Sequence, residues 1–242
     1  MKLLTPAIFE PFPEVVAGMS LRDKHQDGNL SMTENGTDAE TARNNRERFC
    51  RELGFEEDAL AYHPQQRHGK DVHLVHEEFH HRSGDGLIAQ QPGWLLGVTV
   101  ADCVAVLLYD PATGTYGAVH SGWRGSSQNI ADAAIAKAVK EFGVDPRGLY
   151  AWISPAGGGD SYQVGSEVAN QFNPRYSQPV EDDTWLFDNK SVVHDQLMGS
   201  GLEPGRIEMS QLDSITNQEL HSARRDGESS GRMLAAIGVI SV

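Results

Sequence analysis

Two apolar segments joined by a tight turn restrict the fold of this chain more than any other feature. Residues 104–109 and 115–120 are each long enough for a β-strand, and Asp110-Pro111-Ala112-Thr113-Gly114 between them has the composition of a turn. The pattern predicts an antiparallel β-hairpin. Because a hairpin determines which residues of its strands lie opposite each other, it also predicts which polar side chains meet.

A cysteine and a histidine stand at the open end of this hairpin. With the turn centred on Pro111-Ala112, the numbers of opposite residues add up to about 223, which pairs Cys103 with His120 to within a residue or two of register. A thiolate beside an imidazole either binds a metal ion or acts as a nucleophile with its general base. Both alternatives predict an active site here.

His68 is a third candidate for this site. It lies in a short polar segment just before a predicted strand at residues 72–75. Two histidines and one cysteine are an accepted ligand set for a catalytic zinc ion, which keeps a fourth position open for water or substrate. The alternative interpretation of His68 is a histidine in a surface turn.

Three further side chains are candidates for binding or catalysis. Arg124 belongs to residues 121–125, where two glycines, a guanidinium and the free N–H groups of a helix start predict an anion pocket; the alternative is a tight strand-to-helix turn. Asp102 adjoins the cysteine, where a carboxylate can orient a histidine or accept a proton. Asp85 has either such a role or only that of a turn residue.

A run of histidines could suggest a second metal site, but the spacing of these histidines argues against one. The run comprises His73, His76, His80 and His81. Positions 73 and 76 point to opposite faces of a strand, and the chain has no His-x-x-x-His pair with an intervening glutamate. We therefore expect solvated residues at a sheet edge rather than a second metal site.

The remaining pattern predicts an α/β fold. Helices are expected from the N-cap Asp38 to residue 53, from Ser126 or Ser127 to residue 142, and near residues 165–172 and 190–198. Strands are expected at residues 72–75, 95–100, 149–154 and 234–240, besides the hairpin. Because strands, helices and hairpins interleave, we expect a mixed-sheet α/β sandwich, one domain over residues 1–242. Cys50 falls on the apolar side of the first helix and is expected to be inert core.

Composition limits the partners and the compartment. The 242 residues carry a formal charge of −14, which argues against nucleic acid or an acidic membrane as partner but leaves room for a small phosphate-bearing ligand. No apolar run approaches the roughly 18–20 residues that cross a bilayer, and the first residues lack the apolar core of a signal peptide. We expect a cytoplasmic protein whose two cysteines stay reduced.

Several motifs in order along the chain carry a resemblance to a known family. They are Gln66-Arg67-His68-Gly69, Gly84-Asp85-Gly86-Leu87, Val100-Ala101-Asp102-Cys103 and His120-Ser121-Gly122-Trp123-Arg124-Gly125, with weaker matches at Gly18–Arg22, Asn45-Arg46, Ser222–Gly227 and Gly231–Met233. The chain resembles the multicopper polyphenol oxidase (laccase-like) family, also described as purine nucleoside phosphorylases and as peptidoglycan-editing factors.

The resemblance implies a fold, a metal and an activity. The fold would be a single α/β domain like the catalytic domain of cytotoxic necrotising factor toxins, with zinc, or alternatively copper, on His68, Cys103 and His120. The activity would be phosphorolysis of adenosine, inosine, guanosine and methylthioadenosine, with deamination of adenosine. Asp85 or Asp102 would move protons. Phosphate would be held by Arg22, Arg46 or Arg124, and the sequence does not show which of them binds it. The sequence also leaves the oligomeric state open.

Two other functions remain as alternatives. The family's name implies copper-dependent oxidation of phenols, but a laccase needs several copper sites and many more paired histidines than this chain has. A metal-stabilised protein acting on cell-wall precursors is the third reading, and a structural site of that kind would close with a fourth ligand. The chain also departs from the family at residues 154–164, which lack the family's second cysteine and its glutamate.

Overall fold

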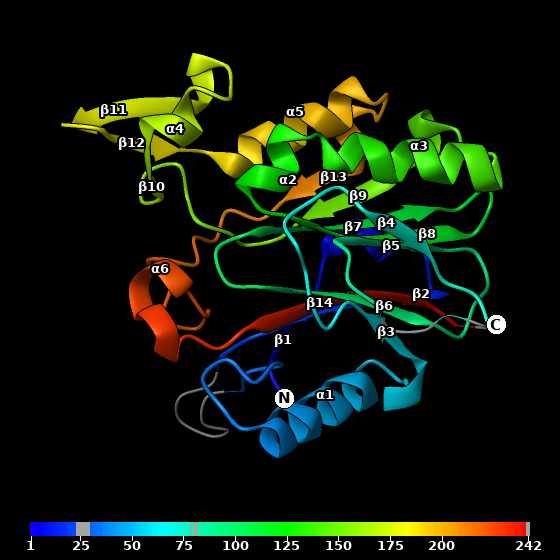
Figure 1. Ribbon diagram of the computed structural model, residues 1–242. Helices are drawn as coiled ribbons and strands as arrows, with labels where there is room; N and C mark the ends of the chain where they lie inside the picture. Colours follow the sequence, from blue (N-terminus) through cyan, green and yellow to red (C-terminus); the bar gives the residue numbers. More distant parts are fainter. Residues whose placement is uncertain (23–29, 78, 80–81, 241–242) are drawn as a thin grey trace.

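The secondary structure forms four layers. The computed structural model describes residues 1–22, 30–77, 79 and 82–240. Helix α1 (Ala39–Glu52) covers the outer face of a five-stranded sheet, which packs against a six-stranded sheet, and helices α3 (Ile130–Phe142) and α5 (Asn189–Gly199) cover the far face of the second sheet (Figure 1). A mixed α/β sandwich with helices outside both sheets is therefore present, as the sequence predicts.

The five-stranded sheet joins the two ends of the chain. Its order is β1 (Leu3–Leu4), β2 (Val15–Ser20), β14 (Met233–Val239), β6 (Leu95–Val100) and β3 (Leu60–Tyr62). The last long strand, β14, lies antiparallel between β2 and β6, whereas β3 is parallel to β6. The pairing of β14 with β6 brings the residues just before β14 beside those just after β6.

The six-stranded sheet contains the hairpin at its centre. Its order is β13 (Ile207–Met209), β9 (Tyr150–Ile153), β7 (Val104–Asp110), β8 (Thr115–Ser121), β5 (Gly86–Ala89) and β4 (Val72–Leu74). Strands β7, β8, β5 and β9 pair antiparallel, and the two edge strands pair parallel to their neighbours. The sheet is mixed, as predicted, and β4 with His73 lies at its edge.

Shorter elements complete the chain. A small sheet is formed by β10 (Gln163–Gly165), β12 (Thr184–Phe187) and β11 (Ser177–Glu181), and the short helices are α2 (Trp123–Ser127), α4 (Ser166–Ala169) and α6 (Ala223–Asp226). Single 3₁₀ turns lie at Ala7–Phe9, Glu57–Ala59, Pro146–Gly148, Pro174–Tyr176, Pro204–Arg206 and Gly227–Ser229. Among the described residues, no helix is long and apolar enough to cross a membrane.

The hairpin strands are mostly apolar because both faces of their sheet are buried. Along β7, Ala105 and Leu107 face the five-stranded sheet, whereas Val104 and Val106 face the helices, as the two-residue period of a strand requires. Cys103 has the parity of Ala105 and packs on the same side. The cysteine therefore ends up on the sheet face that is turned toward the interior of the sandwich.

The predicted hairpin register is two positions off, yet the predicted neighbours meet. His120 lies opposite Ala105 because the turn comprises the four residues 111–114 rather than Pro111-Ala112 alone, with Gly114 in the left-handed region at φ 71°. A shift of two keeps side chains on the same face. Cys103 and His120 are therefore diagonal neighbours rather than directly opposite.

The helix predictions hold in part. The Asp38 carboxylate accepts a hydrogen bond from the Thr41 N–H, so the first N-cap is confirmed. The N-cap predicted at Ser126 or Ser127 is wrong: both serines belong to α2, and Asn129, at φ 57°, separates α2 from α3. The predicted helix at residues 165–172 is shortened to α4. Cys50 is buried in the core beneath α1, as predicted.

We expect Gly117→Ala to destabilise the fold. Gly117 lies in β8, and a Cβ there would stand 2.5 Å from Ile88 Cδ1 and 2.9 Å from the backbone oxygen of Leu87. Such overpacking should lower the free energy of unfolding by about 1–3 kcal/mol, measured by urea denaturation. Gly199→Ala is the control, because a Cβ at that helix end meets no atom within 4 Å. Equal midpoints for the two variants would contradict the prediction.

Candidate metal centre and its pocket

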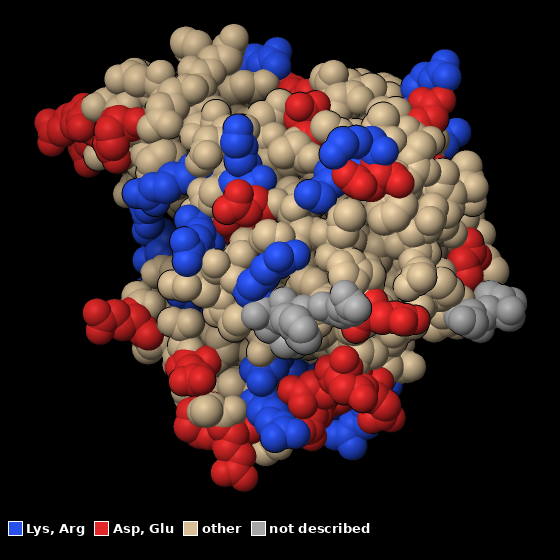
Figure 2. Space-filling model, turned by 45° about the vertical axis from the view of Figure 1, so that its right-hand side comes forward, with Lys and Arg blue, Asp and Glu red and all other residues tan. Residues whose placement is uncertain are grey.

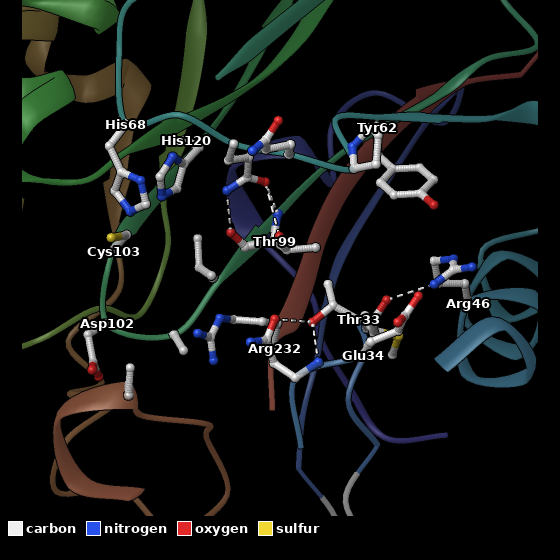
Figure 3. A pocket seen from close by; sticks show the side chains of 18 of the residues that line it. Thr33, Glu34, Arg46, Tyr62, His68, Thr99, Asp102, Cys103, His120 and Arg232 are labelled. Carbon is white, nitrogen blue, oxygen red and sulfur yellow. Dashed lines mark hydrogen bonds between the residues drawn. The ribbon is translucent and has the colours of Figure 1, made fainter. Parts of the chain in front are cut away.

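Three side chains from distant parts of the chain converge at the open end of the hairpin. One ligand atom each of His68, Cys103 and His120 lies within 4.8 Å of the other two (Figure 3). Among the described residues, no other group of three histidine, cysteine or acidic side chains is placed to hold a metal ion. The sequence predicts the pairing of the last two, and the resemblance adds the first.

A buried carboxylate orients both histidines. Asp85, which has no exposed surface, accepts hydrogen bonds from the backbone N–H groups of Arg67 (3.2 Å), His68 (2.8 Å) and Gly69 (2.8 Å). Its Oδ1 also lies 2.9 Å from His120 Nδ1, which leaves Nε2 of that ring facing the cluster. A carboxylate behind a ligating histidine is the usual arrangement at metal centres, because it sets the tautomer and the ring orientation.

The charges of the cluster favour an ionised cysteine. Burial opposes ionisation of the Cys103 thiol, but the neighbouring imidazoles of His120 and His68 lower its pKa to about 6. Burial likewise opposes protonation of His120, but Cys103 and Asp85 raise the pKa of this histidine to about 9. The two side chains stabilise each other as thiolate and imidazolium, the state from which a metal ion would displace a proton.

A glycine makes room for the convergence. A Cβ on Gly122 would lie 2.9 Å from Cys103 Sγ and 2.8 Å from Cδ2 of the His68 ring, so a larger residue would push these groups apart. Two imidazoles and one thiolate match the three-ligand sets of catalytic zinc sites. The residues present therefore fit a divalent metal ion whose remaining coordination position faces the cavity.

The cluster forms one end of a cavity of about 780 Å³. Figure 3 shows His68, His120 and Cys103 at one side, Thr99 and Arg232 in the middle, and Tyr62, Arg46 and Glu34 at the far side. This volume is within the range of sites for small molecules the size of a nucleoside. The cavity mixes polar and aromatic side chains, and it opens directly onto the cluster.

Of the other predicted residues, Asp102, Arg124 and Arg46 line this cavity, and the first two belong to its metal end. The Asp102 carboxylate accepts hydrogen bonds from Ser214 Oγ (2.6 Å) and from the Arg224 N–H (2.7 Å), so it points toward α6 and away from the cluster. The guanidinium of Arg124 lies over the Trp123 ring, 4.1 Å from its centroid. The segment of residues 121–125 thus serves partly as the predicted turn and partly as a wall of the cavity.

The two other predicted phosphate ligands lie farther away. Arg22 is outside the cavity lining and donates to the Asp226 carboxylate at 2.8 Å. Arg46 lines the far end, where it donates to the Met32 carbonyl (3.0 Å) and lies 3.5 Å from a Glu57 oxygen. The geometry brings only Arg124, of the three, near the metal end.

Sequence reasoning missed Arg224, Arg232 and Tyr162, all of which line the cavity. Both arginines belong to the C-terminal motifs that carry the resemblance, which is the signal that could have found them. Outside the cluster, His73 Nε2 lies 3.2 Å from the Ser83 carbonyl and belongs to no metal site in the described part of the chain. His80 and His81 lie outside the described residues.

Comparison with known proteins identifies the family. Residues 15–240 match the family model described as multi-copper polyphenol oxidoreductase laccase. The chain belongs to this family. A family relative from Deinococcus radiodurans, named purine nucleoside phosphorylase, is 32% identical over 217 residues, covering 87% of this chain and 82% of the relative. Purine nucleoside phosphorylase YfiH of Escherichia coli is 29% identical, covering 73% and 72%.

Two solved structures share the fold of this chain. The crystal structure of YlmD from Geobacillus stearothermophilus superimposes with a TM-score of 0.87 at 27% identity, covering 96% of this chain and 94% of that one. The hypothetical protein YfiH of Bacillus licheniformis gives a TM-score of 0.89 at 24% identity, covering 98% and 96%. These structures show the fold, and the match to the family model confirms the family expected from the sequence motifs.

The two cysteines should differ sharply in reactivity. In metal-free protein, we expect iodoacetamide to alkylate Cys103 with a rate that rises to half its maximum near the pKa of about 6, since only the thiolate reacts. Cys50 is the internal control, because burial raises the pKa of its thiol to about 12. Peptide mass spectrometry reads both sites. Reaction of Cys103 only above pH ~8, as for an ordinary thiol, would contradict the ion pair.

Removal of either hairpin ligand should release the metal. We expect the parent protein to bind zinc, measured by plasma emission spectroscopy, and Cys103→Ala and His120→Ala to lose this zinc while remaining folded by far-ultraviolet circular dichroism. Cys50→Ala removes the other sulfur and should keep its zinc. Full occupancy in both ligand variants would show that the cluster is not the metal site.

Proposed function

We propose that this protein is a zinc-dependent purine nucleoside phosphorylase acting on adenosine, inosine, guanosine and methylthioadenosine, with adenosine deaminase activity. The observation that carries the proposal is the three-ligand cluster of His68, Cys103 and His120 open to a cavity of nucleoside size. The names of the relatives support the same activity. We propose a single domain, because β2 near the start of the chain and β14 near its end pair in one sheet. We also propose the cytoplasm as the compartment.

The reaction transfers a ribosyl group to phosphate. An oxygen of hydrogen phosphate forms a bond to C1′ of the ribose while the C1′–N9 bond breaks. The bonding electron pair goes to the purine, and the phosphate proton ends on the purine, which leaves as the free base. A zinc ion bound by the cluster would supply a Lewis acid with an open coordination position.

The two predicted acids act in this proposal by positioning other groups. Both carboxylate oxygens of Asp85 accept hydrogen bonds from N–H donors, and in this way Asp85 holds His68 and His120 toward each other. Asp102 uses its oxygens on Ser214 and on the backbone of Arg224, and so fixes that arginine at the cavity wall. Arg124 is placed to contact substrate or phosphate directly.

The alternative functions receive less support from the geometry. The family description names a multi-copper oxidoreductase, and the cluster would bind Cu²⁺ tightly by the general affinity order. Within the described residues, however, the single three-ligand cluster offers no second site for the trinuclear centre of a laccase. A purely structural metal would gain a fourth protein ligand, whereas here the open side faces a cavity.

The proposal predicts that phosphate accelerates the loss of inosine and adenosine. Chromatography should detect free base and ribose 1-phosphate, and inosine formed from adenosine without phosphate would report the deaminase. Asp85→Asn should lower the rate about 10–100-fold, because an amide replaces one acceptor oxygen by a donor that faces backbone N–H groups. If nucleosides stay intact at every phosphate concentration, the proposed function is wrong.

A further inference from the structure

Within the described residues, seven of the fourteen arginines of this protein form an ion pair with a carboxylate. Arginines in such ion pairs, with N–O distances from 2.6 to 3.5 Å, are Arg22, Arg43, Arg46, Arg147, Arg175, Arg206 and Arg225. In this chain, with its net charge of −14, the 34 acidic residues outnumber the 20 lysines and arginines. Arginines that lack such a partner therefore call for a separate explanation.

Three of the arginines without such a partner in the described part of the chain line the same cavity, whereas Arg51, Arg67 and Arg82, which also lack one there, are exposed and lie outside it. Among the described residues, the guanidinium groups of Arg124, Arg224 and Arg232 form no ion pair with a carboxylate. In the view of Figure 2, Lys and Arg side chains gather at the left of the molecule, between two groups of Asp and Glu. The lining of the cavity itself carries five arginines and only two acids, Glu34 and Asp102. A positive region is thus maintained at the cavity within an acidic protein.

Aromatic rings and carbonyl groups hold these guanidinium groups without neutralising them. Arg124 lies 4.1 Å over the Trp123 ring and Arg224 lies 5.1 Å over the Tyr162 ring. A ring face positions a cation and leaves the N–H groups at the edge of the guanidinium plane available to a ligand. Arg232 donates hydrogen bonds from one nitrogen, Nη1, to the Ser230 and Gly231 carbonyls, at 2.9 and 3.0 Å.

The three arginines surround the metal end rather than the far end of the cavity. Figure 3 shows Arg232 directed toward the side of Cys103 and Asp102, and these two groups are the charges that act on it. Arg124 and Arg224 also line a second cavity of about 400 Å³, together with Trp123 and Tyr162. The same two guanidinium groups are therefore accessible from two sides.

Carboxylates do line both cavities, but they are engaged elsewhere or at a distance. Asp102 directs its oxygens to Ser214 and the Arg224 backbone, and Glu34 lies at the far side of the larger cavity. Glu167 and Asp183 line the second cavity and form no ion pair with either of its arginines. The missing counter-charge is thus left for a ligand to supply.

We propose that Arg124, Arg224 and Arg232 form an anion subsite beside the metal cluster, and that its ligand is inorganic phosphate. Forked guanidinium donors match the oxygens of phosphate, and hydrogen bonds between charged groups are the strong ones. The second cavity gives phosphate a route to Arg124 and Arg224 while a nucleoside occupies the larger one. This inference rests on the proposed function, in which phosphate is a substrate, and it names the residues that would bind this phosphate.

Phosphate binding in the absence of nucleoside tests the subsite directly. We expect orthophosphate to bind the zinc-loaded protein in calorimetry at constant ionic strength. Arg124→Gln, Arg224→Gln and Arg232→Gln should each raise the Kd about tenfold to a hundredfold. Arg232→Lys, which keeps the charge, should lose less. Arg147→Gln is the control, because that exposed arginine pairs with Asp145 and lies outside both cavities.

Several outcomes would overturn the assignment. The first is that the three variants bind phosphate with the same Kd as the Arg147→Gln control. The second is that Arg46→Gln raises the Kd for phosphate while the three variants do not. If the arginines serve only as counter-charges of Cys103, the variants will change zinc content and the alkylation profile but not the phosphate Kd. Binding of a nucleoside 5′-monophosphate but not of orthophosphate would identify a phosphate ester as the ligand and reject the proposal as stated.

The subsite and the proposed function can fail separately. Unchanged KM for phosphate in the arginine variants, with nucleosides still cleaved, rejects the subsite and leaves the phosphorylase standing. Phosphate binding that depends on the three arginines, without cleavage of any nucleoside, supports the subsite and rejects the phosphorylase.

Discussion

The carboxylate of Asp85 joins the two halves of the candidate metal centre, and the rest of the site depends on it. A buried charge is costly unless its oxygens are hydrogen-bonded, and here three consecutive backbone N–H groups and one imidazole satisfy it. Burial opposes ionisation of Asp85, but these hydrogen-bond donors outweigh burial and lower the pKa of the carboxyl group. The carboxylate therefore stabilises the fold at pH values above the pKa of Asp85 in the unfolded chain. This stabilisation is lost as the pH falls through the pKa of Asp85 in the folded protein. The loop must wrap around the carboxylate, which explains why His68 adopts the left-handed region at φ 58°.

Strand pairing brings the C-terminal arginines to the same place. Met233, the first residue of β14, pairs with Val100, the last residue of β6, so Arg232 is carried next to the segment of Asp102 and Cys103. The backbone N–H of Arg224 then binds Asp102 from α6. Asp102, predicted as a catalytic acid, thus binds the backbone of the cavity wall, and two of the three arginines come from parts of the chain more than a hundred residues away.

The arrangement of charges gives the site a consistent chemistry. A thiolate and two imidazoles present soft and borderline ligands to a metal ion, and the adjacent guanidinium groups lack carboxylate partners within the described chain. The cluster and the arginines share one end of a cavity whose other end is polar and partly aromatic. An anion beside the metal and an organic group farther along the cavity are the ligands this layout favours, which is what phosphorolysis of a nucleoside requires.

The sequence by itself determined the hairpin, the apolar strands, the N-cap at Asp38 and the common face of Cys103 and His120, because turn residues, capping residues and two-residue periodicity act between near neighbours. Motif resemblance added His68 and the family. Only the tertiary structure decided that Asp85 and Asp102 bind backbone groups, that Arg22 pairs with Asp226, and that Arg224 and Arg232 reach the cavity. These contacts join residues far apart in the chain, and they follow from the order of strands in the sheets, which no local pattern encodes.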